Sequence, residues 1–229
     1  MSREINYSKQ TFDNPNPIAR FAHRSRYKKS LDLAALYTPE NGALLDFGAG
    51  QGDFLHRLSL RRPDLRLTAF EPIMKLAYPN IESRAAMSAF PSQSMDVICA
   101  YEVMEHLSEG HTQSFIDEAR RVCKPGGHII VSVPVMQGLA LPIKEASRSI
   151  LFRRRSDYSF KELAIGLFGG NVVRAENILT SHKGFDHRQL RRTLERHFQL
   201  LSMTKSPIPF LPWWLSSQVF LIFSQQSGK

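Results

Sequence analysis

The sequence is poor in the features that mark several large classes of protein. It has only two cysteines, Cys99 and Cys123, in 229 residues, and neither lies in a CxxC or Cys/His pattern. This excludes a disulfide framework and a cysteine-based zinc site, so a reducing compartment is the default. We expect a cytoplasmic protein, because the first residues, MSREINYSKQ, contain no apolar core of a secretory signal.

Long apolar runs are also missing. The longest uncharged stretch, residues 206–228, is interrupted by Pro207, Pro209 and Pro212. A membrane-spanning helix needs about 20 consecutive, mostly apolar residues, so we expect no such span. Apolar residues make up 42% of the chain and charged residues 22%, which is typical of a folded globular protein. The length suits one domain with a full hydrophobic core.

Positive charge is concentrated outside the middle of the chain. The formal net charge is +9, yet residues 44–134 carry 9 basic and 11 acidic side chains, whereas residues 135–196 carry 12 basic and 6 acidic ones. A basic periphery suits phosphates, anionic lipid headgroups or nucleic acid. A solvated surface explains it equally well.

Short apolar segments alternate with helical patterns from residue 43 onward. This rhythm predicts a parallel sheet with helices on both faces, a doubly wound α/β fold. We expect a preceding helix over Arg20–Tyr37, a short helix over Met74–Tyr78 and a turn at Lys124–Gly127. The last two strands, residues 198–204 and 218–223, are joined by 13 residues of proline-rich loop. That is short for a helical crossover, so we expect an antiparallel pair at the sheet edge.

A glycine-rich turn is the most informative local feature. Gly48, Gly50 and Gly52 follow a predicted strand and open a predicted helix, where glycine lets the backbone approach a ligand closely. Glu71 ends the next strand, 21 residues after Gly50, where an acid can accept hydrogen bonds from ribose hydroxyls. The spacing G-x-G-x-G differs from the dinucleotide fingerprint G-x-G-x-x-G, which disfavours an NAD(P) dehydrogenase.

Four segments in this order, LLDFGAGQGDF, TAFEP, MDVICAYEVMEHL and CKPGGHIIVSVP, resemble the class I S-adenosylmethionine-dependent methyltransferases. Within that family, the chain looks most like the ubiquinone-pathway and other small-molecule O-methyltransferases. The resemblance covers roughly residues 43–134. It implies a seven-stranded, mostly parallel sheet of order 3-2-1-4-5-7-6 with strand 7 antiparallel. It also implies S-adenosyl-L-methionine as the cofactor and S-adenosyl-L-homocysteine as the product.

The resemblance also implies a division of the single domain, residues 1–229. The expected parts are an N-terminal cap (1–42), a cofactor-binding core (43–134), an insert that forms an acceptor lid (135–180), and a C-terminal helix with edge strands (181–229).

Carried over position by position, the resemblance implies the cofactor-binding residues. Asp46 would hold the methionine end, and Glu71 the ribose. Many relatives carry an Asp-Ala pair after the third strand, whereas this chain has Arg84-Ala85, so the acid that meets the adenine amino group is missing. The full set comprises Asp46, the turn residues Gly48, Ala49, Gly50 and Gly52, then Glu71, Pro72 and Ile73, Ala85, and Tyr101 and Glu102 after the fourth strand.

Methyl transfer to an oxygen also needs a group that removes the acceptor's proton, and histidine is the natural candidate. Ligands in open α/β sheets bind at the carboxyl ends of the strands. We expect His106 to be the base, with His182 second. His23, His111 and His187 remain alternatives at the same end.

Glu102 to His106 form an E-x-x-E-H pattern. In small-RNA 2′-O-methyltransferases and some ubiquinone-pathway enzymes a similar pattern binds a divalent ion, and His182 or His187 would supply a further ligand. The E-H-L sequence is also widespread in metal-free relatives. We therefore expect no metal, with a divalent ion as the alternative.

The expected function is O-methylation of a small-molecule or lipid-linked acceptor. The alternatives are an RNA 2′-O-methyltransferase and a catalytically idle S-adenosylmethionine-binding subunit. The chain has no RNA-binding signature, so we expect no nucleic-acid partner. Residues 139–168 combine apolar side chains with Arg153, Arg154 and Arg155, which predicts a peripheral contact with the membrane surface. We expect a monomer or a homodimer.

Overall fold

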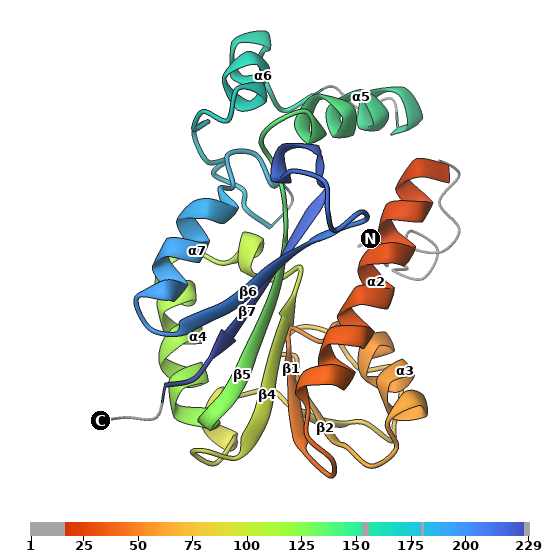
Figure 1. The fold of residues 1–229 in the computed structure, drawn as a ribbon, viewed down its shortest axis with the longest axis vertical. Coiled ribbons are helices and arrows are strands. Elements are labelled where there is room, and N and C mark those ends of the chain that lie inside the picture. Colours follow the sequence, from red (N-terminus) through yellow and green to blue (C-terminus); the bar gives the residue numbers. More distant parts are fainter. Residues whose placement is uncertain (1–16, 153–155, 180, 227–229) are drawn as a thin grey trace.

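The computed structural model describes residues 17–152, 156–179 and 181–226, and its centre is one seven-stranded sheet (Figure 1). The strand order is β3-β2-β1-β4-β5-β7-β6. All neighbours pair in parallel except β5 with β7 and β6 with β7, which are antiparallel. This confirms the predicted sheet. The strands are β1 (Ala43–Phe47), β2 (Arg66–Phe70), β3 (Glu82–Arg84), β4 (Met95–Tyr101), β5 (Cys123–Pro134), β6 (Gln199–Ser206) and β7 (Gln218–Ser224).

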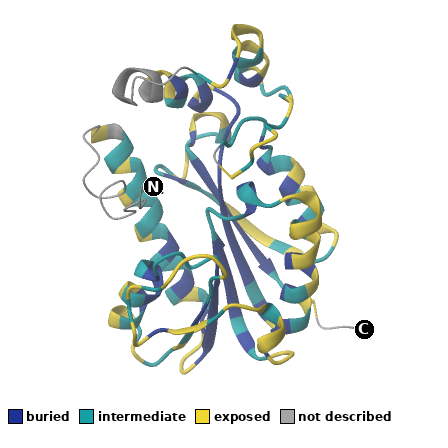
Figure 2. Cartoon of the chain, turned by 180° about the vertical axis from the view of Figure 1, so that it is seen from behind, coloured by how far each residue is buried: buried dark blue, intermediate teal, exposed yellow. Residues whose placement is uncertain are grey.

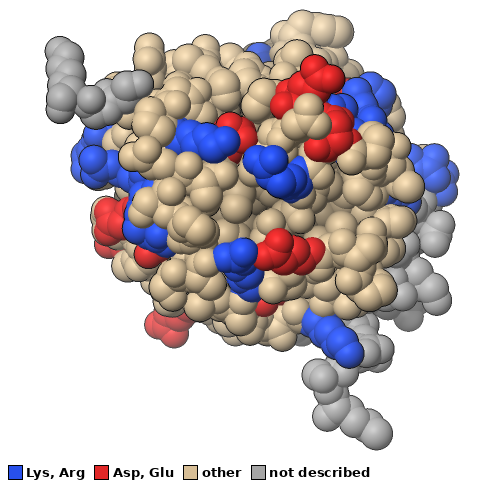
Figure 3. All heavy atoms as spheres, turned by 90° about the horizontal axis from the view of Figure 1, so that it is seen from below, with Lys and Arg blue, Asp and Glu red and all other residues tan. Residues whose placement is uncertain are grey.

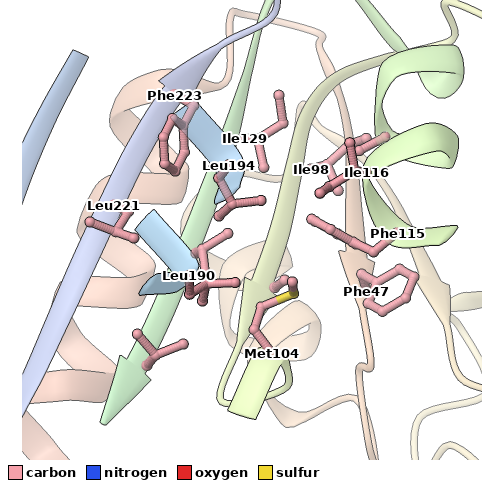
Figure 4. Packing of buried hydrophobic residues seen from close by; sticks show 14 of the residues in the cluster. Phe47, Ile98, Met104, Phe115, Ile116, Ile129, Leu190, Leu194, Leu221 and Phe223 are labelled. Atoms are coloured by element: carbon pink, nitrogen blue, oxygen red, sulfur yellow. The ribbon is translucent and has the colours of Figure 1, made fainter. Parts of the chain in front are cut away.

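Helices cover both faces of the sheet. On one face, α4 (Glu109–Val122) and α7 (His187–Glu195) pack on β1, β4, β5 and β7. Figure 4 shows Phe115 and Ile116 of α4 and Leu190 and Leu194 of α7 directed into this core. On the other face, α2 (Pro17–Tyr37) and α3 (Asp53–Arg61) contribute Ala34, Phe54, Leu55 and Leu58 to a second core cluster.

The central strands are apolar on both faces because both faces are covered. β1 is buried along its whole length, and β7 over all but its last residue (Figure 2). Strands buried on both sides read as continuous apolar runs. Burying each such apolar side chain contributes roughly 1.5–3 kcal/mol, so these strands form a stable base for the site at the edge where β1 ends and the antiparallel β7 begins.

Two helices stand at the carboxyl end of the sheet, above β4 and β5. They are α5 (Ala140–Phe152) and α6 (Phe160–Leu167), and both belong to the segment between β5 and α7 (Figure 1). The main-chain amide of Gly138 donates a hydrogen bond to the carbonyl oxygen of Gly166 at 2.8 Å, which ties the start of α5 to the end of α6.

Two local expectations are wrong. Residues 74–78 form bends and irregular chain rather than a helix, and the Ala77 amide donates to the carbonyl oxygen of Gln51 at 2.9 Å instead of to a residue one helical turn earlier. Lys124–Gly127 belongs to β5 rather than to a separate turn. It forms an irregularity there, since the pairing shifts from Met95 with Cys123 to Val97 with His128.

Within the described residues, no helix has the length and apolar character needed to cross a membrane. Both cysteines are buried free thiols.

Candidate functional site

A cavity opens where the carboxyl ends of β1, β4 and β5 meet helix α2. It lies beside the glycine-rich turn between β1 and α3, at the edge where α/β sheets bind ligands. Its lining comes from α2 (Arg26, Tyr27, Ser30), from β1 and the turn (Asp46, Gly48, Ala49, Gly50, Gln51, Asp53, Phe54), and from Met74, Tyr101, Glu102 and Ser132.

The glycines of the turn are required by its backbone. Gly48, Gly50 and Gly52 have φ values of 78°, 57° and 87°, which L side chains rarely adopt. A Cβ atom at Gly48 would lie only 2.6 Å from Cγ2 of Val103. The turn therefore forms a narrow cradle of bare main chain on one side of the cavity.

Glu71 follows β2 and reaches this turn from the side. Its carboxylate accepts hydrogen bonds from the main-chain amides of Gly50 at 2.7 Å, Ile73 at 2.9 Å and Met74 at 3.0 Å. A carboxylate has about four lone-pair positions, so acceptor capacity remains for a ligand hydroxyl. Glu71 is not itself among the cavity-lining residues, and its contact with a ribose stays a prediction.

Asp46 is a buried acid at the floor of the cavity, with only 4% of its surface exposed. Burial, and then repulsion by Glu71, raise the pKa of its carboxyl to about 7. A ligand ammonium group beside it would offset both effects. The bare glycine cradle, the buried acid and the carboxylate at the end of β2 together fit the methionine end and the ribose of S-adenosylmethionine.

The other predicted cofactor residues divide into two groups. Ala49, Tyr101 and Glu102 line the cavity along with the glycines at 48 and 50. Their neighbours on the adenine side do not line it: Gly52, Pro72 and the exposed Ile73 and Ala85. Contacts of these four with the cofactor remain predictions.

Helix α2 supplies three cavity residues that the sequence reasoning missed. Arg26 Nη1 lies 2.8 Å from Glu102 Oε2, and the Tyr101 hydroxyl donates to the carbonyl oxygen of Ser30 at 3.2 Å. His23, Arg26, Tyr27 and Ser30 are spaced i, i+3, i+4 and i+7, which places polar side chains on one helical face. This spacing was the only feature of the sequence that could have indicated that α2 lines the cavity.

Glu102 lines the cavity and connects three elements around it. It has a φ of 58°, and its Oε1 accepts hydrogen bonds from Ser132 Oγ at 2.9 Å and from the Gln218 side-chain amide. With Arg26 on Oε2, both oxygens of this carboxylate have partners, which come from β5, β7 and α2.

A buried lysine lies behind Glu102. The Lys144 ammonium donates to the carbonyl oxygens of Val135 at 2.9 Å and Ser217 at 2.8 Å, which fastens α5 to the ends of β5 and β7. Burial lowers its pKa to about 8. Burial also lowers the pKa of His23 and of His187 to about 4, so both imidazoles are neutral at pH 7.

The two histidines predicted as catalytic come together at this end of the sheet. His106 lies in the short turn η2 (Met104–His106) after β4, and His182 in the loop before α7. Their Nε2 atoms are 3.2 Å apart, and Nδ1 of His106 is 2.9 Å from the carbonyl oxygen of Ile178. Neither histidine lines the cofactor cavity itself.

The remaining histidine candidates have other surroundings. His111 is exposed in the first turn of α4, where its Nδ1 lies 3.1 Å from the hydroxyl of Ser108. His187 packs against Trp213 with ring centroids 5.7 Å apart. Of the two later histidines considered for the E-x-x-E-H pattern, His182 is the one beside Glu105 and His106.

Comparisons with known proteins agree with this geometry. A family model described as "Methyltransferase domain" matches residues 19–202. Among solved structures, the PH0226 protein from Pyrococcus horikoshii OT3 is 14% identical, with 96% of each chain covered and a TM-score of 0.61. The N-methyltransferase NodS from Bradyrhizobium japonicum WM9 is 15% identical over 94% of this chain and 99% of that one, with a TM-score of 0.58.

A third solved structure contains ligands. The 1,6-didemethyltoxoflavin-N1-methyltransferase from Burkholderia thailandensis, with bound 1,6-didemethyltoxoflavin and S-adenosylhomocysteine, is 15% identical. The alignment covers 88% of this chain and 79% of that one, with a TM-score of 0.58. No curated protein sequence matches the chain. At these identities, the solved structures show the fold alone.

Proposed function

Because this chain belongs to the methyltransferase domain family and is an S-adenosylmethionine-dependent methyltransferase, we propose that it methylates an oxygen atom of a small-molecule or lipid-linked acceptor. The observation that carries the choice of oxygen is the pair His106 and His182. Their ring nitrogens face each other 3.2 Å apart at the carboxyl end of the sheet, next to the cofactor cavity.

The chemistry explains why such a pair matters. In methyl transfer, a lone pair of the acceptor attacks the methyl carbon while the carbon–sulfur bond breaks and its electrons return to sulfur. A hydroxyl acceptor must also lose its proton, and a neutral imidazole is the usual proton acceptor near pH 7. The Ile178 carbonyl oxygen can only accept a hydrogen bond, so Nδ1 of His106 carries the proton, and its Nε2 is left to receive another.

The rest of the site positions the reactants and excludes water. Helix α2 closes one side through Arg26 and Tyr27, and α5 is fixed over the strand ends by Lys144. Much of the acceleration of an in-line displacement can come from such positioning. Asp46 and Glu71 would hold the cofactor so that its methyl group faces the acceptor side, where Glu102 lies.

The outer surface of the segment with α5 and α6 suits contact with a membrane that holds a lipid-linked acceptor. Exposed apolar side chains lie just before and on α5, on α6 and its C-terminal end, and on the loop before β7: Leu139, Ile143, Phe160, Ile165, Phe168, Phe210, Trp214 and Leu215. Phe160 and Phe168 are 92% and 89% exposed. Such residues within a basic segment suit an interfacial contact with anionic headgroups. The arginines predicted for this contact, residues 153–155, lie outside the described residues.

An RNA acceptor is the second candidate, and the described structure offers little for it. On the face shown in Figure 3, away from α5 and α6, basic and acidic side chains are interspersed. At the amino ends of the strands, Arg62 pairs with Asp64 and Lys124 pairs with Asp96, each with an N–O distance of 2.7 Å. RNA binding would need a continuous basic surface. An idle cofactor-binding subunit is disfavoured because the acceptor side carries the two facing imidazoles.

Labelled methyl transfer tests the proposal. The purified chain is incubated with S-adenosylmethionine carrying a labelled methyl group and, separately, with a lipid extract, an aqueous small-molecule extract and total RNA. We expect label in a small-molecule or lipid product, attached to oxygen by mass spectrometry, and none with Asp46→Ala. Label confined to RNA, or a methyl group on nitrogen or carbon, would refute O-methylation of a small molecule.

A further inference from the structure

A cluster of polar side chains at the carboxyl end of the sheet consists of the buried Glu105 and the half-buried His106 and His182. The first two sit in η2, directly after β4, and the third in the loop between α6 and α7. One carboxylate oxygen and one ring nitrogen from each histidine all lie within 4.8 Å of one another. Segments far apart in the chain therefore converge on one point.

The hydrogen bond from His106 to the main chain leaves its other ring nitrogen available to bind a metal ion. Its Nδ1–H donates to the Ile178 carbonyl oxygen at 2.9 Å, so in the neutral ring the Nε2 lone pair points at His182. Histidines that bind metals almost always donate their other ring N–H to a carbonyl or carboxylate oxygen in this way. The hydrogen bond both orients the ring and selects the tautomer.

Glu105 adds a carboxylate that the described structure leaves unsatisfied. The residue is fully buried, and neither of its carboxylate oxygens has a hydrogen-bond partner. The Arg174 guanidinium donates to the main-chain oxygen of Glu105 instead. An isolated buried carboxylate is costly unless a cation or a hydrogen-bond donor compensates it.

Glu102 does not belong to this group, although it is the first acid of the E-x-x-E-H pattern. Both of its carboxylate oxygens are already used, by Arg26 on one side and by Ser132 and Gln218 on the other. The convergent set is one carboxylate and two imidazoles. Imidazole ligands favour zinc-type transition metals, whereas all-oxygen sites favour magnesium.

We propose that Glu105, His106 and His182 bind one divalent transition-metal ion of the zinc class. Two nitrogens bonded to one tetrahedral zinc ion lie about 3.3 Å apart, and the Nε2 atoms here are 3.2 Å apart. The sequence led us to expect no metal; the geometry of this group points to one. Three protein ligands leave a further position for water or substrate, which is typical of catalytic rather than structural sites.

The ion would have two consequences. It would join η2 to the loop before α7 and so fix these two segments to each other at the carboxyl end of the sheet. If the proposed O-methylation is correct, on which this second consequence rests, an acceptor hydroxyl bound to the ion would lose its proton more easily. His106 would then be a ligand, and the ion rather than a free imidazole would promote deprotonation.

Direct metal binding tests the site without any methyl acceptor. The full chain, freed of any affinity tag and stripped with a chelator, is titrated with Zn²⁺ by calorimetry and with Co²⁺ by visible absorption. We expect one ion per chain and Co²⁺ bands typical of nitrogen and oxygen ligands. Mg²⁺ should bind far more weakly. A melting-temperature increase on addition of Zn²⁺ provides a second readout.

Two variants and a matched control locate the ion. Glu105→Gln and His182→Gln should each weaken Zn²⁺ binding by at least about 10-fold. A loss of about 10-fold is the smallest typical effect of replacing a residue that only hydrogen-bonds to a metal ligand, so loss of a ligand itself should cost at least as much. The control is His197→Gln, a histidine after α7 outside the group, which should bind like the unaltered chain. Normal S-adenosylhomocysteine affinity verifies that each variant is folded.

Absence of stoichiometric binding, or binding that survives in both variants, would overturn the metal site. Loss of binding in both, with His197→Gln unaffected, supports it. A chain that binds no Zn²⁺ but methylates an oxygen would leave the proposed function intact. A chain that binds Zn²⁺ at this site but methylates only nitrogen, carbon or RNA would refute the proposed function and keep the site.

Discussion

Arg26 and Glu102 form an ion pair, 2.8 Å between Nη1 and Oε2, that joins helix α2 to the residue following β4. Both side chains are less than a fifth exposed and line the cofactor cavity. The pair holds α2 against the carboxyl end of β4, so this helix forms one wall of the cavity.

Breaking this pair should loosen α2. Arg26→Gln removes the charged donor and leaves Glu102 with only its Ser132 and Gln218 partners, so we expect a loss of roughly 1–3 kcal/mol in stability. Amide hydrogen exchange should speed up along α2. The control on the same helix is Lys28→Gln, whose exposed pair with Asp32 should contribute no more than about 1 kcal/mol. If amide hydrogen exchange along α2 were equally fast in the two variants, the ion pair of Arg26 with Glu102 would not be what holds this helix in place.

Glu71 should matter for cofactor affinity. Its carboxylate organises the amides of Gly50, Ile73 and Met74 and has acceptor capacity left for ribose hydroxyls. We expect Glu71→Ala to weaken S-adenosylhomocysteine binding by roughly 1–3 kcal/mol, measured by calorimetry. Glu82→Ala, on the exposed strand β3, is the control and should bind normally. Normal affinity in Glu71→Ala would remove the ribose assignment.

The glycine turn offers a matched pair of substitutions. Gly48→Ala places a Cβ atom 2.6 Å from Val103 at a φ of 78°, and we expect it to lower the free energy of unfolding by about 1–3 kcal/mol. Gly110→Ala, in the first turn of α4, has nothing within 4 Å, and it should raise stability by about 0.4–1 kcal/mol. Chemical denaturation measures both. Equal effects would mean that the turn is not strained.

The buried acid Asp46 should make stability and cofactor binding depend on pH. Its folded-state pKa of about 7 lies above the unfolded value of 3.8, so the folded state binds the proton more tightly. Without cofactor, its contribution to stability is therefore present below pH 4 and is lost as pH rises through 7. Asp46→Asn cannot ionise, and its stability relative to the unaltered chain should increase over this range by up to roughly 4 kcal/mol.

Cofactor binding should respond to pH in the opposite direction. The ammonium group of the methionine end prefers an ionised carboxylate beside it, so affinity for S-adenosylmethionine should fall as pH drops below 7. Calorimetry at several pH values checks this. An affinity that is flat from pH 5 to 8 would show that Asp46 is already ionised or does not face the ammonium group.

Local sequence patterns predict most of the fold but few of the contacts around Glu102 and the two facing histidines. The strand β1, the turn at Gly48–Gly52 and Glu71 lie within 30 residues, and their spacing alone predicts a ligand at the strand ends. Arg26 and Glu102 are 76 positions apart, so their pairing depends on how α2 crosses the sheet. The helix expected at Met74–Tyr78 did not form, and the Ala77 amide bonds instead to the Gln51 carbonyl oxygen in the glycine turn, a contact between separate segments that a local pattern does not predict.

The histidine pair shows the same limit. His106 could be predicted as a site residue from its place after β4. That His182 rather than His187 faces it could not, because the choice depends on the course of the loop between α6 and α7. Likewise, only the three-dimensional structure shows that the Glu105 carboxylate has no hydrogen-bond partner among the described residues, while both carboxylate oxygens of Glu102 have partners.

The most direct test is a calorimetric titration of the full chain with S-adenosylhomocysteine, with Gly50→Leu as the comparison and NADH as the control ligand. Gly50 has a φ of 57° and lines the cavity, so a leucine side chain there would occupy the ligand's space. We predict one S-adenosylhomocysteine bound per chain, none with Gly50→Leu, and no NADH binding. Failure of the unaltered chain to bind S-adenosylhomocysteine, or equal binding in Gly50→Leu, would contradict a methyltransferase site in this cavity.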